Sequence, residues 1–480
     1  MTSLAAEAPT AALRRTLTLK DVVLFNMVAV IGLRWLATSA KTGPSAIALW
    51  VLAALFFFVP QGLAVTELSS RLPSSGGVYH WTKEAWGEGH GFLCGWCYWI
   101  CNVLYYPNLL ISSAVIGTYV VGKGESALAG DWTYVLVATL GALWLAVALN
   151  IVGLGTGKWL QNLGGIGTYL PGVLLVVLAL ISLVSGHPAA NPITADAIVP
   201  DLGEFSELNL WASIAFAFAG LELSATMGDE IEQPRRTLPR AIFVSAPLIA
   251  IVYILGTWAL LRLVPVDRIN IVSGFLQAID AGTRQLGAGA ALAWLAPAAA
   301  AAYTVGNVGG VGAWLSGPAR VAFVIGIDRY FPPAFGKVHP KWRTPYVAIL
   351  VQAALATVFL LLSVLGKGTT VEKAYLILLD TQLLIYFIPY LYLFAAYLRH
   401  RRRESATDPA AVVRVPGSAA GAWTVGLAGF AMTAFAMILA CIPPGDTADP
   451  WLFRAKVIGG AAAFVALGGV LYWRAQGRRR

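Results

Sequence analysis

The chain has 480 residues, of which 58% are hydrophobic and only 12% are charged, and its mean hydropathy is +0.71. A water-soluble domain carries about 25% charged residues, so the composition excludes a soluble globular protein. The net charge of +9 suits two classes of partner, nucleic acid and a membrane surface, which the placement of the charges must separate. The four cysteines are too few and too clustered for a disulfide framework.

Apolar runs long enough to cross a bilayer recur along the whole chain. A helix of about 20 residues crosses a hydrocarbon core of about 30 Å and satisfies its backbone polar groups internally. The pattern therefore predicts an all-α polytopic membrane protein, with two shorter helices at 269–284 and 317–328. The twelve predicted transmembrane spans are 20–40, 45–69, 89–119, 131–153, 160–185, 208–229, 241–264, 289–315, 345–366, 372–398, 420–441 and 454–475.

The positive charges predict the orientation. Lys and Arg concentrate in the segments before span one, after every even-numbered span and at the end of the chain, whereas the outer loop 186–207 has acidic residues and no Lys or Arg. Cytoplasmic segments carry the positive excess, so both termini are predicted to be cytoplasmic, in the inner cell membrane. The runs Arg399–Arg403 and Arg478–Arg480 determine topology and suit anionic lipid, and nucleic acid is not expected.

The order of the spans predicts an internal repeat. Spans one and six each contain a glycine and a charge inside an apolar helix. Because each set has five spans, an odd number, the second set enters the membrane from the opposite side, as in inverted-repeat transporters. The predicted units are a tail at 1–19, a core at 20–398 with repeats 20–185 and 208–398, a basic linker at 399–419, two further helices at 420–475 and a tail at 476–480.

Three sequence blocks carry a resemblance to a known family. They are Thr66–Gly87 (TELSSRLPSSGGVYHWTKEAWG), Gly91–Trp96 (GFLCGW) and Asp229–Arg240 (DEIEQPRRTLPR). In this order and spacing they resemble the amino acid–polyamine–organocation transporters, over roughly residues 20 to 400. The resemblance implies a LeuT-like fold of twelve transmembrane helices, a five-plus-five inverted repeat with broken helices one and six, and transport of an amino acid or amine.

A finer resemblance rests on span eight and the segment after it. Gly309–Arg320 (GGVGAWLSGPAR) and Tyr330–His339 (YFPPAFGKVH) are similar to the glutamate/GABA antiporter branch and to the arginine/agmatine exchangers. This likeness implies exchange of one small molecule for another.

Span one is expected to bind substrate around Ile31, Gly32 and Leu33, where a broken helix exposes backbone amides to a carboxylate. The family usually has a Gly-x-Gly element here, but Arg34 stands in place of the second glycine. Arg34 has two readings. It contacts an anionic substrate group, since guanidinium suits carboxylates, or it pairs with Glu222 or faces a water-filled vestibule.

Span six is expected to contribute Phe216, Ala217, Ala219, Gly220 and Glu222 to the substrate site. A charge near the bilayer centre costs several kcal/mol, about 2.5 to 3.5 on insertion scales, unless it is paired or hydrated. The resemblance implies that Phe216 covers bound substrate and that Glu222 couples to gating or protonation. The alternatives are that Phe216 is a core or lipid-facing residue and that Glu222 caps free backbone amides.

Other spans supply further candidates. Trp314 matches an exchanger position implied to line the pathway, although Trp is also a common interfacial anchor. Asn102 and Tyr106 are one helical turn apart in span three and are expected near the substrate. Asp380 in span ten either relays protons or satisfies a neighbouring helix. Proton-coupled relatives carry a lysine in span five where Thr168 stands here, which favours exchange.

Metal and nucleotide sites are not expected. His90, Cys94, Cys97 and Cys101 share one face of span three, but one helix cannot readily wrap a tetrahedral metal site, and cysteine suits tight helix packing. The chain has no Gly-x-x-x-x-Gly-Lys-[Ser/Thr] loop, so no cofactor or energised pump is predicted.

The sequence thus predicts a secondary-active transporter of amino acids or related amines, most simply an exchanger, working by alternating access in a lipid bilayer. A proton-coupled amino acid symporter is the alternative within the class. A non-transporting membrane amino acid sensor is the alternative from another class. An enzyme is not expected, because no nucleophile and base cluster at membrane depth. A homodimer stays open.

Overall fold

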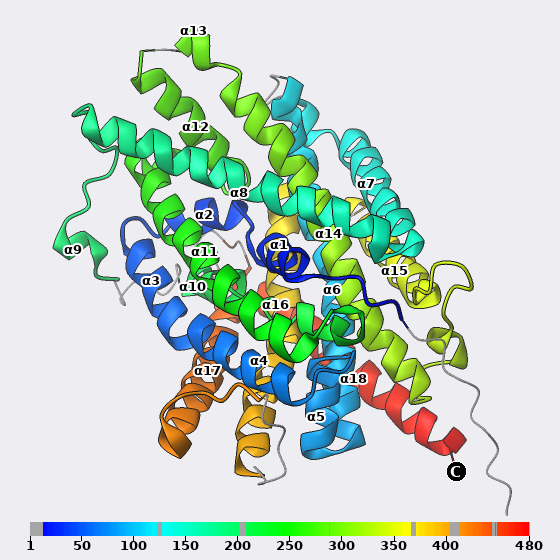
Figure 1. Ribbon diagram of the computed structural model, residues 1–480. Helices are drawn as coiled ribbons and strands as arrows, with labels where there is room; N and C mark the ends of the chain where they lie inside the picture. The colour runs from blue at the N-terminus through cyan, green and yellow to red at the C-terminus, as the bar shows by residue number, and fades with distance from the viewer. Residues whose placement is uncertain are drawn as a thin grey trace, which may run out of the picture.

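The computed structural model describes residues 13–121, 127–200, 208–287, 289–365, 371–403, 412–443, 447 and 449–479, and it is helical almost throughout (Figure 1). Within these ranges the extended segments pair only at an isolated parallel bridge between Leu17 and Ile231. The predicted all-α class is confirmed. Helix is expected here because a segment inside lipid must satisfy every backbone group internally.

The first half of the chain contains two spans with local irregularities. The first span is a bent pair of helices, and the second has a π-helical stretch between two α-helices, which run on from one another without a break. The elements are α1 (Leu19–Val30), α2 (Arg34–Ala40), α3 (Ser45–Ala53), η1 (Ala54–Phe58), α4 (Val59–Arg71), α5 (Val78–Trp86), α6 (Glu88–Gly117), η2 (Thr118–Val121), η3 (Ala127–Gly130), α7 (Trp132–Val152), α8 (Leu154–Val184) and α9 (Ala195–Ile198).

The second half begins with another interrupted span and continues with long helices. Its elements are α10 (Leu208–Ala217), η5 (Ser224–Glu230), α11 (Pro234–Leu263), η6 (Val266–Arg268), α12 (Gly274–Gln285), α13 (Gly289–Leu292), α14 (Leu295–Ile327), η7 (Pro333–Gly336), α15 (Tyr346–Leu365), α16 (Val371–Arg402), α17 (Ser418–Ala440) and α18 (Pro450–Arg479).

Length and composition identify many membrane-spanning candidates. In the described residues, nine helices are long and apolar enough to cross a bilayer, and the α1–α2 pair, bent by 40°, makes a tenth. The apolar stretch Tyr346–Leu362 of α15 is shorter. The predicted span at 208–229 corresponds to α10 and η5, which are separated by an irregular segment. The chain is therefore a multi-pass helical membrane protein, and the count of twelve spans stays a prediction.

The prediction of a separate helix at 317–328, after span eight, is wrong. The structure has one continuous helix, α14, which passes through Pro318. Proline has no N–H, so the carbonyl four residues earlier, that of Trp314, loses its helical partner. The Tyr106 hydroxyl donates a hydrogen bond to this carbonyl at 2.9 Å. Because the freed carbonyl is satisfied from α6, the helix continues.

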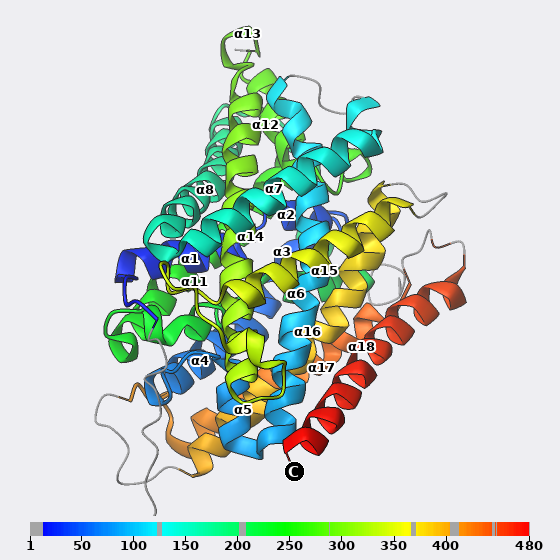
Figure 2. The ribbon, with the colours of Figure 1, turned by 90° about the vertical axis from the view of Figure 1, so that its right-hand side faces the viewer.

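Burial separates a central core from a periphery. In their most apolar windows, α6 and α14 are 83% and 89% buried, whereas α17 and α18 are 33% and 17% buried. Figure 2 shows α6 and α14 running through the middle of the molecule and α18 along one flank. The helices predicted to stand outside the repeats are thus peripheral, with apolar faces left for lipid.

The segments predicted to be cytoplasmic meet at one end of the molecule. Polar contacts join them across long distances in sequence, so they share one side of the bundle. α5 and the last turns of α16 lie together at the lower end of the view in Figure 2. The contacts are Thr16 N to Glu230 O at 2.9 Å, Lys158 Nζ to Asp21 at 3.2 Å, Ser75 N to Asp229 at 3.2 Å, Lys83 Nζ to Asp328 at 2.6 Å and Arg401 to Glu67 at 3.1 Å.

Candidate functional site

The first helix break lies between α1 and α2. α1 ends at Val30 and α2 begins at Arg34, so backbone groups in between lack regular helical partners. The carbonyl of Ala29 accepts a hydrogen bond from the Trp314 indole at 3.0 Å, and the amide of Gly32 donates to the Tyr253 hydroxyl at 3.0 Å. Side chains from α14 and α11 therefore stabilise the interrupted backbone.

The second break lies between α10 and η5. α10 ends at Ala217, and the backbone at Gly220 has a φ of +129°, which glycine alone adopts without strain. The Gly220 amide donates to the Tyr390 hydroxyl at 2.8 Å. A Cβ atom at Gly220 would lie 3.1 Å from Val30 Cγ2 and 3.3 Å from Trp314. The two breaks thus approach each other closely at this glycine.

Tyr253 of α11 joins the two breaks. Its hydroxyl accepts from the Gly32 amide, and it lies within donating distance of the Val30 carbonyl at 2.5 Å and the Ala217 carbonyl at 3.1 Å. One hydroxyl has one proton, so it serves these two carbonyls in turn. Nothing in the sequence around Tyr253 distinguished it from other tyrosines of the spans.

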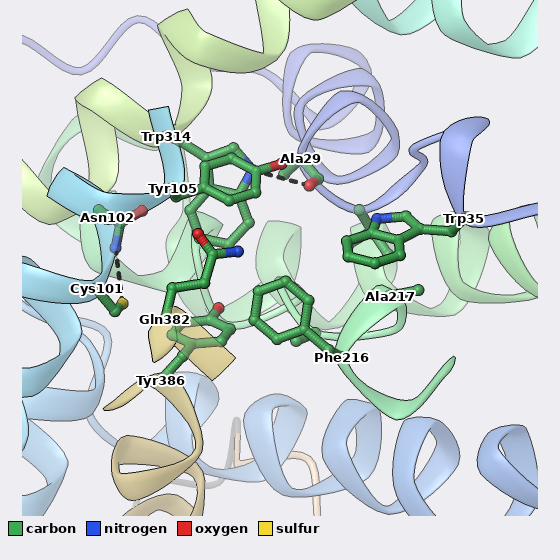
Figure 3. Close-up of a pocket in the computed structure, with 12 residues that line it drawn as sticks. Ala29, Trp35, Cys101, Asn102, Tyr105, Phe216, Ala217, Trp314, Gln382 and Tyr386 are labelled. Atoms are coloured by element: carbon green, nitrogen blue, oxygen red, sulfur yellow. Dashed lines mark hydrogen bonds between the residues drawn. The ribbon is translucent and has the colours of Figure 1, made fainter. Parts of the chain in front are cut away.

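A small cavity lies beside the breaks (Figure 3). The space open to the centre of a water molecule is about 20 Å³, which is room for about one water. Five of the twelve lining residues are aromatic, and none carries a charged side chain. The lining residues are Ala29, Val30, Trp35, Cys101, Asn102, Tyr105, Phe216, Ala217, Ala219, Trp314, Gln382 and Tyr386.

The aromatic rings of the cavity contact one another at their edges. Phe216 lies 5.6 Å, centroid to centroid, from Trp35 and 5.6 Å from Tyr386. Trp314 lies 5.9 Å from Tyr386 and 5.1 Å from Tyr105. These rings come from spans one, three, six, eight and ten, so contacts between five different spans close the cavity.

Comparisons with known proteins agree with this architecture. Residues 17–463 match the family model described as amino acid permease. The chain belongs to the amino acid permease family. Among the relatives of this permease, an uncharacterised transporter of Legionella pneumophila is 31% identical over 94% of this chain and 95% of its own length.

Relatives with functional names include an antiporter and an exchanger. A glutamate/gamma-aminobutyrate antiporter of Lactococcus lactis is 25% identical over 83% of this chain and 78% of its own length. A serine/threonine exchanger of Bacillus subtilis is 29% identical over 68% of this chain and 71% of its own length. The resemblance to amino acid–polyamine–organocation transporters, including the antiporter branch, is therefore confirmed, and the permease is a membrane transporter of amino acids or related molecules.

The permease structure distributes the predicted substrate residues into two groups. Five of them line the cavity. The others lie behind the lining residues, and in two cases an adjacent residue in the sequence lines the cavity instead. Tyr105 lines the cavity while Tyr106 supports Trp314 from behind, and Trp35 lines it while Arg34 does not. The lining group is Asn102, Phe216, Ala217, Ala219 and Trp314, and the second group is Ile31, Gly32, Leu33, Arg34, Tyr106, Gly220 and Glu222.

Sequence reasoning missed Gln382, which is 1% exposed and points into the cavity (Figure 3). Neither the oxygen nor the nitrogen of its side-chain amide has a hydrogen-bond partner in the described structure, and the Asn102 side-chain oxygen is in the same condition. Buried polar groups without partners cost free energy, about 1–3 kcal/mol each. Such groups beside a cavity are available to bond a water molecule or a polar ligand. The signal in the sequence was the polar run Asp380-Thr381-Gln382 inside an apolar stretch.

Arg34 is fully buried behind two lining rings of the permease. Its guanidinium carbon lies 4.7 Å from the ring centroid of Trp35 and 5.7 Å from that of Tyr105. Its backbone amide donates to the Tyr303 hydroxyl at 3.4 Å. The guanidinium is therefore one side chain away from the cavity, and a shift of Trp35 or Tyr105 would open a path to it.

Glu222 stands behind Tyr386 in a dense hydrogen-bond network. Its carboxylate accepts from the Tyr98 hydroxyl at 3.0 Å, from Gln61 Nε2 at 2.9 Å and from the Gly220 amide at 3.2 Å. The hydroxyls of Tyr386 and Tyr390 donate to it as well. The carboxylate takes these bonds from side chains of α4, α6 and α16 rather than from Arg34, so it connects three helices to the second break.

The remaining candidates lie apart from the cavity. Asp380 falls in α16, but its side chain is outside the described residues. Thr168 is buried where α8 packs closely on α14, since a Cβ at Gly306 would meet its hydroxyl at 2.4 Å. Cys94 and Cys97 are buried in helix packing, and His90 Nδ1 bonds the Tyr392 hydroxyl at 3.0 Å. No group of three metal-ligating side chains occurs in the described ranges.

Proposed function

We propose that this permease exchanges amino acids by alternating access and binds substrate in the aromatic cavity between the two helix breaks. The observation that carries the proposal is the meeting of both breaks at one buried cavity through Tyr253 and Gly220. Interrupted helices place backbone groups at a substrate site near the bilayer midplane. The exchange names of two relatives support the same reading.

The arrangement of the core is part of the proposal. Residues 20–398 form two inverted repeats, 20–185 and 208–398, and the helices at 420–475 stand outside them. Both termini are cytoplasmic in the inner cell membrane. Support comes from the clustering of the basic segments at one end, as the positive-inside rule expects, and from the pairing of α1–α2 with α10 and α11.

The lining of the cavity favours a substrate with an ammonium group. Aromatic rings attract cations over their faces, by about 0.5–2 kcal/mol according to desolvation. Trp35, Tyr105, Phe216, Trp314 and Tyr386 surround the space. The Arg34 guanidinium already lies against Trp35 and Tyr105, so Phe216, Trp314 and Tyr386 are the rings left for a substrate cation. The Gln382 amide and the Asn102 oxygen offer hydrogen bonds to the polar groups of the substrate.

The small volume describes an occluded conformer. About 20 Å³ is too little for an amino acid, because small-molecule sites measure about 300–1,000 Å³. Substrate entry requires separation of the rings around Phe216, which contacts Trp35 and Tyr386. Phe216 therefore acts as the lid, and rocking of α1–α2 and α10–η5 against α6, α14 and α16 opens the cavity to one side at a time.

Uptake into proteoliposomes tests the proposed function. The permease is reconstituted in vesicles that are empty or preloaded with an amino acid, and a radiolabelled panel of amino acids and amines is added outside. Uptake that depends on internal substrate supports exchange. Uptake driven by a pH gradient into empty vesicles would instead establish proton symport, and binding of an amino acid without uptake in either condition would establish a sensor.

Gln382→Leu is expected to weaken substrate binding about tenfold or more while the folded yield stays the same. No hydrogen bond among the described residues is lost, because neither polar atom of the amide has a partner there, whereas a bond to a charged substrate contributes about 1.5–3 kcal/mol. Half-saturation of exchange and size-exclusion profiles measure the two effects. Gln161→Leu is the matched control. Gln161 does not line the cavity, and its amide donates a hydrogen bond of 3.2 Å to the Ser316 hydroxyl, so half-saturation is expected to stay unchanged. Unchanged half-saturation in Gln382→Leu would contradict the assignment.

Arg34→Lys tests whether the guanidinium reaches substrate. If Trp35 or Tyr105 moves and Arg34 contacts an anionic group, the variant loses exchange of acidic substrates selectively, because lysine cannot make the two-pronged carboxylate contact. Exchange of glutamate is compared with exchange of neutral amino acids in the same vesicles, with the folded yield as the control. Equal losses for both classes would show that Arg34 only supports the fold.

A further inference from the structure

A second pocket, of about 550 Å³, lies far from the aromatic cavity, between the last turns of α16, the first half of α17 and the end of α5. We call it the α16–α17 groove. It has a basic end formed by Arg399, Arg402 and Arg403, and apolar walls that include Trp423, Leu427 and Phe430. Figures 1 and 2 both show the end of α16 beside α17 and α5.

The basic end is not neutralised by any carboxylate of the described residues. Within the described part of the chain, none of the three arginines forms an ion pair with a carboxylate, whereas their neighbour Arg401 pairs with Glu67 at 3.1 Å. Arg399 stacks its guanidinium 4.2 Å above the Trp86 ring, and its Nε atom is buried with no hydrogen-bond partner. Arg403 donates to a backbone carbonyl, that of Glu84, at 3.3 Å.

The apolar walls face outward from the bundle. Trp423, Leu427 and Phe430 are 41%, 53% and 37% exposed, and they follow one another at helical spacing on one side of α17. Residues four and three apart share a helix face. Because α17 is among the membrane-spanning candidates, this face lies against acyl chains rather than water.

Positive charge above an apolar groove fits one chemical class of ligand. Guanidinium groups bind phosphate with two parallel hydrogen bonds, and basic clusters at the end of a span attract anionic lipids. Trp86 and Trp423 have the amphipathic ring that prefers the bilayer interface. A free phosphate would leave the apolar walls without a partner, and a zwitterionic lipid would leave the arginine charge unbalanced.

We propose that the α16–α17 groove binds an anionic phospholipid, with the headgroup phosphate on Arg399, Arg402 and Arg403 and an acyl chain along α17. The site is independent of the transported substrate. It occupies the junction of α17 with the helix that carries Gln382, Tyr386 and Tyr390, so lipid bound there holds the C-terminal end of a helix that lines the cavity.

Lipid binding to the purified full chain tests the proposal. Delipidated permease is titrated with phosphatidylglycerol or phosphatidylcholine, and bound lipid is counted by native mass spectrometry. The wild-type chain is expected to retain phosphatidylglycerol preferentially. Replacing Arg399, Arg402 and Arg403 together with glutamine is expected to weaken its binding about tenfold or more, and Arg402→Gln, an exposed single change, to weaken it partially.

The matched control replaces the arginines of the run Arg478–Arg480 with glutamine, which removes the same charge at the end of the chain. This control is expected to keep the bound lipid. Equal loss in the control would show attraction by net charge alone, and equal retention by the groove variants would overturn the site. Competition by inorganic phosphate as strong as that by phosphatidylglycerol would assign the arginines to a free anion. Size-exclusion profiles show whether each variant is folded.

Discussion

Glu222→Gln is expected to slow exchange at least about tenfold and to change its dependence on pH, while the protein still folds. The carboxylate is an acceptor for hydroxyls of α6 and α16 and for the Gln61 amide of α4. Hydrogen bonds to a charged group contribute about 1.5–3 kcal/mol each. A glutamine removes the charge and turns one acceptor into a donor, so the hydrogen bonds between these helices become weaker. We expect this loss to differ between conformers and therefore to change the free-energy differences that set the exchange rate.

The fold is expected to survive because the network can rearrange. The hydroxyls of Tyr98 and Tyr386 can rotate to accept a hydrogen bond from the new amide, since a hydroxyl both donates and accepts. Gln61 has an unpartnered oxygen that an amide flip would bring to the site. The change therefore affects the free-energy difference between conformers more than the free energy of unfolding.

The effect is measured as exchange rates in proteoliposomes at pH values between about 5 and 8. Glu67→Gln is the matched control, because Glu67 is also a buried carboxylate but lies at the end of α4, where it pairs with Arg401. The control is expected to lower stability and to leave the shape of the pH profile unchanged. An unaltered profile in Glu222→Gln would remove Glu222 from proton coupling and leave it a structural acceptor.

Gly220→Ala is expected to abolish exchange and to reduce the folded yield. The φ of +129° is unfavourable for any residue with a Cβ, at a cost of about 1–3 kcal/mol. The added methyl group would also lie 3.1 Å from Val30 and 3.3 Å from Trp314, both of which line the cavity. The backbone strain and the steric contact both destabilise the segment where the two helix breaks meet.

A second glycine separates these two effects. Gly87, between α5 and α6, has a φ of +96°, and a Cβ atom there would meet nothing within 4 Å. Gly87→Ala therefore carries backbone strain without crowding, and it is expected to lower the melting temperature while exchange persists. Melting temperature and exchange rate are measured for both variants. Exchange at the wild-type rate in Gly220→Ala would show that the breaks do not need to approach each other.

Several features of this permease follow from composition along short stretches of chain. The membrane class, the positions of most spans and the clustering of basic segments depend on local hydrophobicity and charge, which require no knowledge of the packing. The breaks in spans one and six were also visible, because Gly32, Gly220 and Glu222 interrupt apolar helices. The family blocks in Thr66–Gly87 and Asp229–Arg240 carried the likeness that the comparisons confirmed.

The identity of the cavity wall depends on how each helix is rotated and what packs against it. Successive residues of a helix point about 100° apart, so Tyr105 rather than Tyr106, and Trp35 rather than Arg34, face the cavity. Tyr253 and Tyr386 had no local signal, because their roles come from partners far away in sequence.

The same reason explains the continuous α14. Pro318 predicts a helix end when only its neighbours are considered, yet the hydroxyl of Tyr106, more than 200 residues earlier, satisfies the carbonyl that the proline frees. Hydrophobicity and charge decide which segments enter the membrane because each segment meets lipid independently of the others. Which side chains meet inside, and hence where substrate and lipid can bind, is decided only when all the helices pack together.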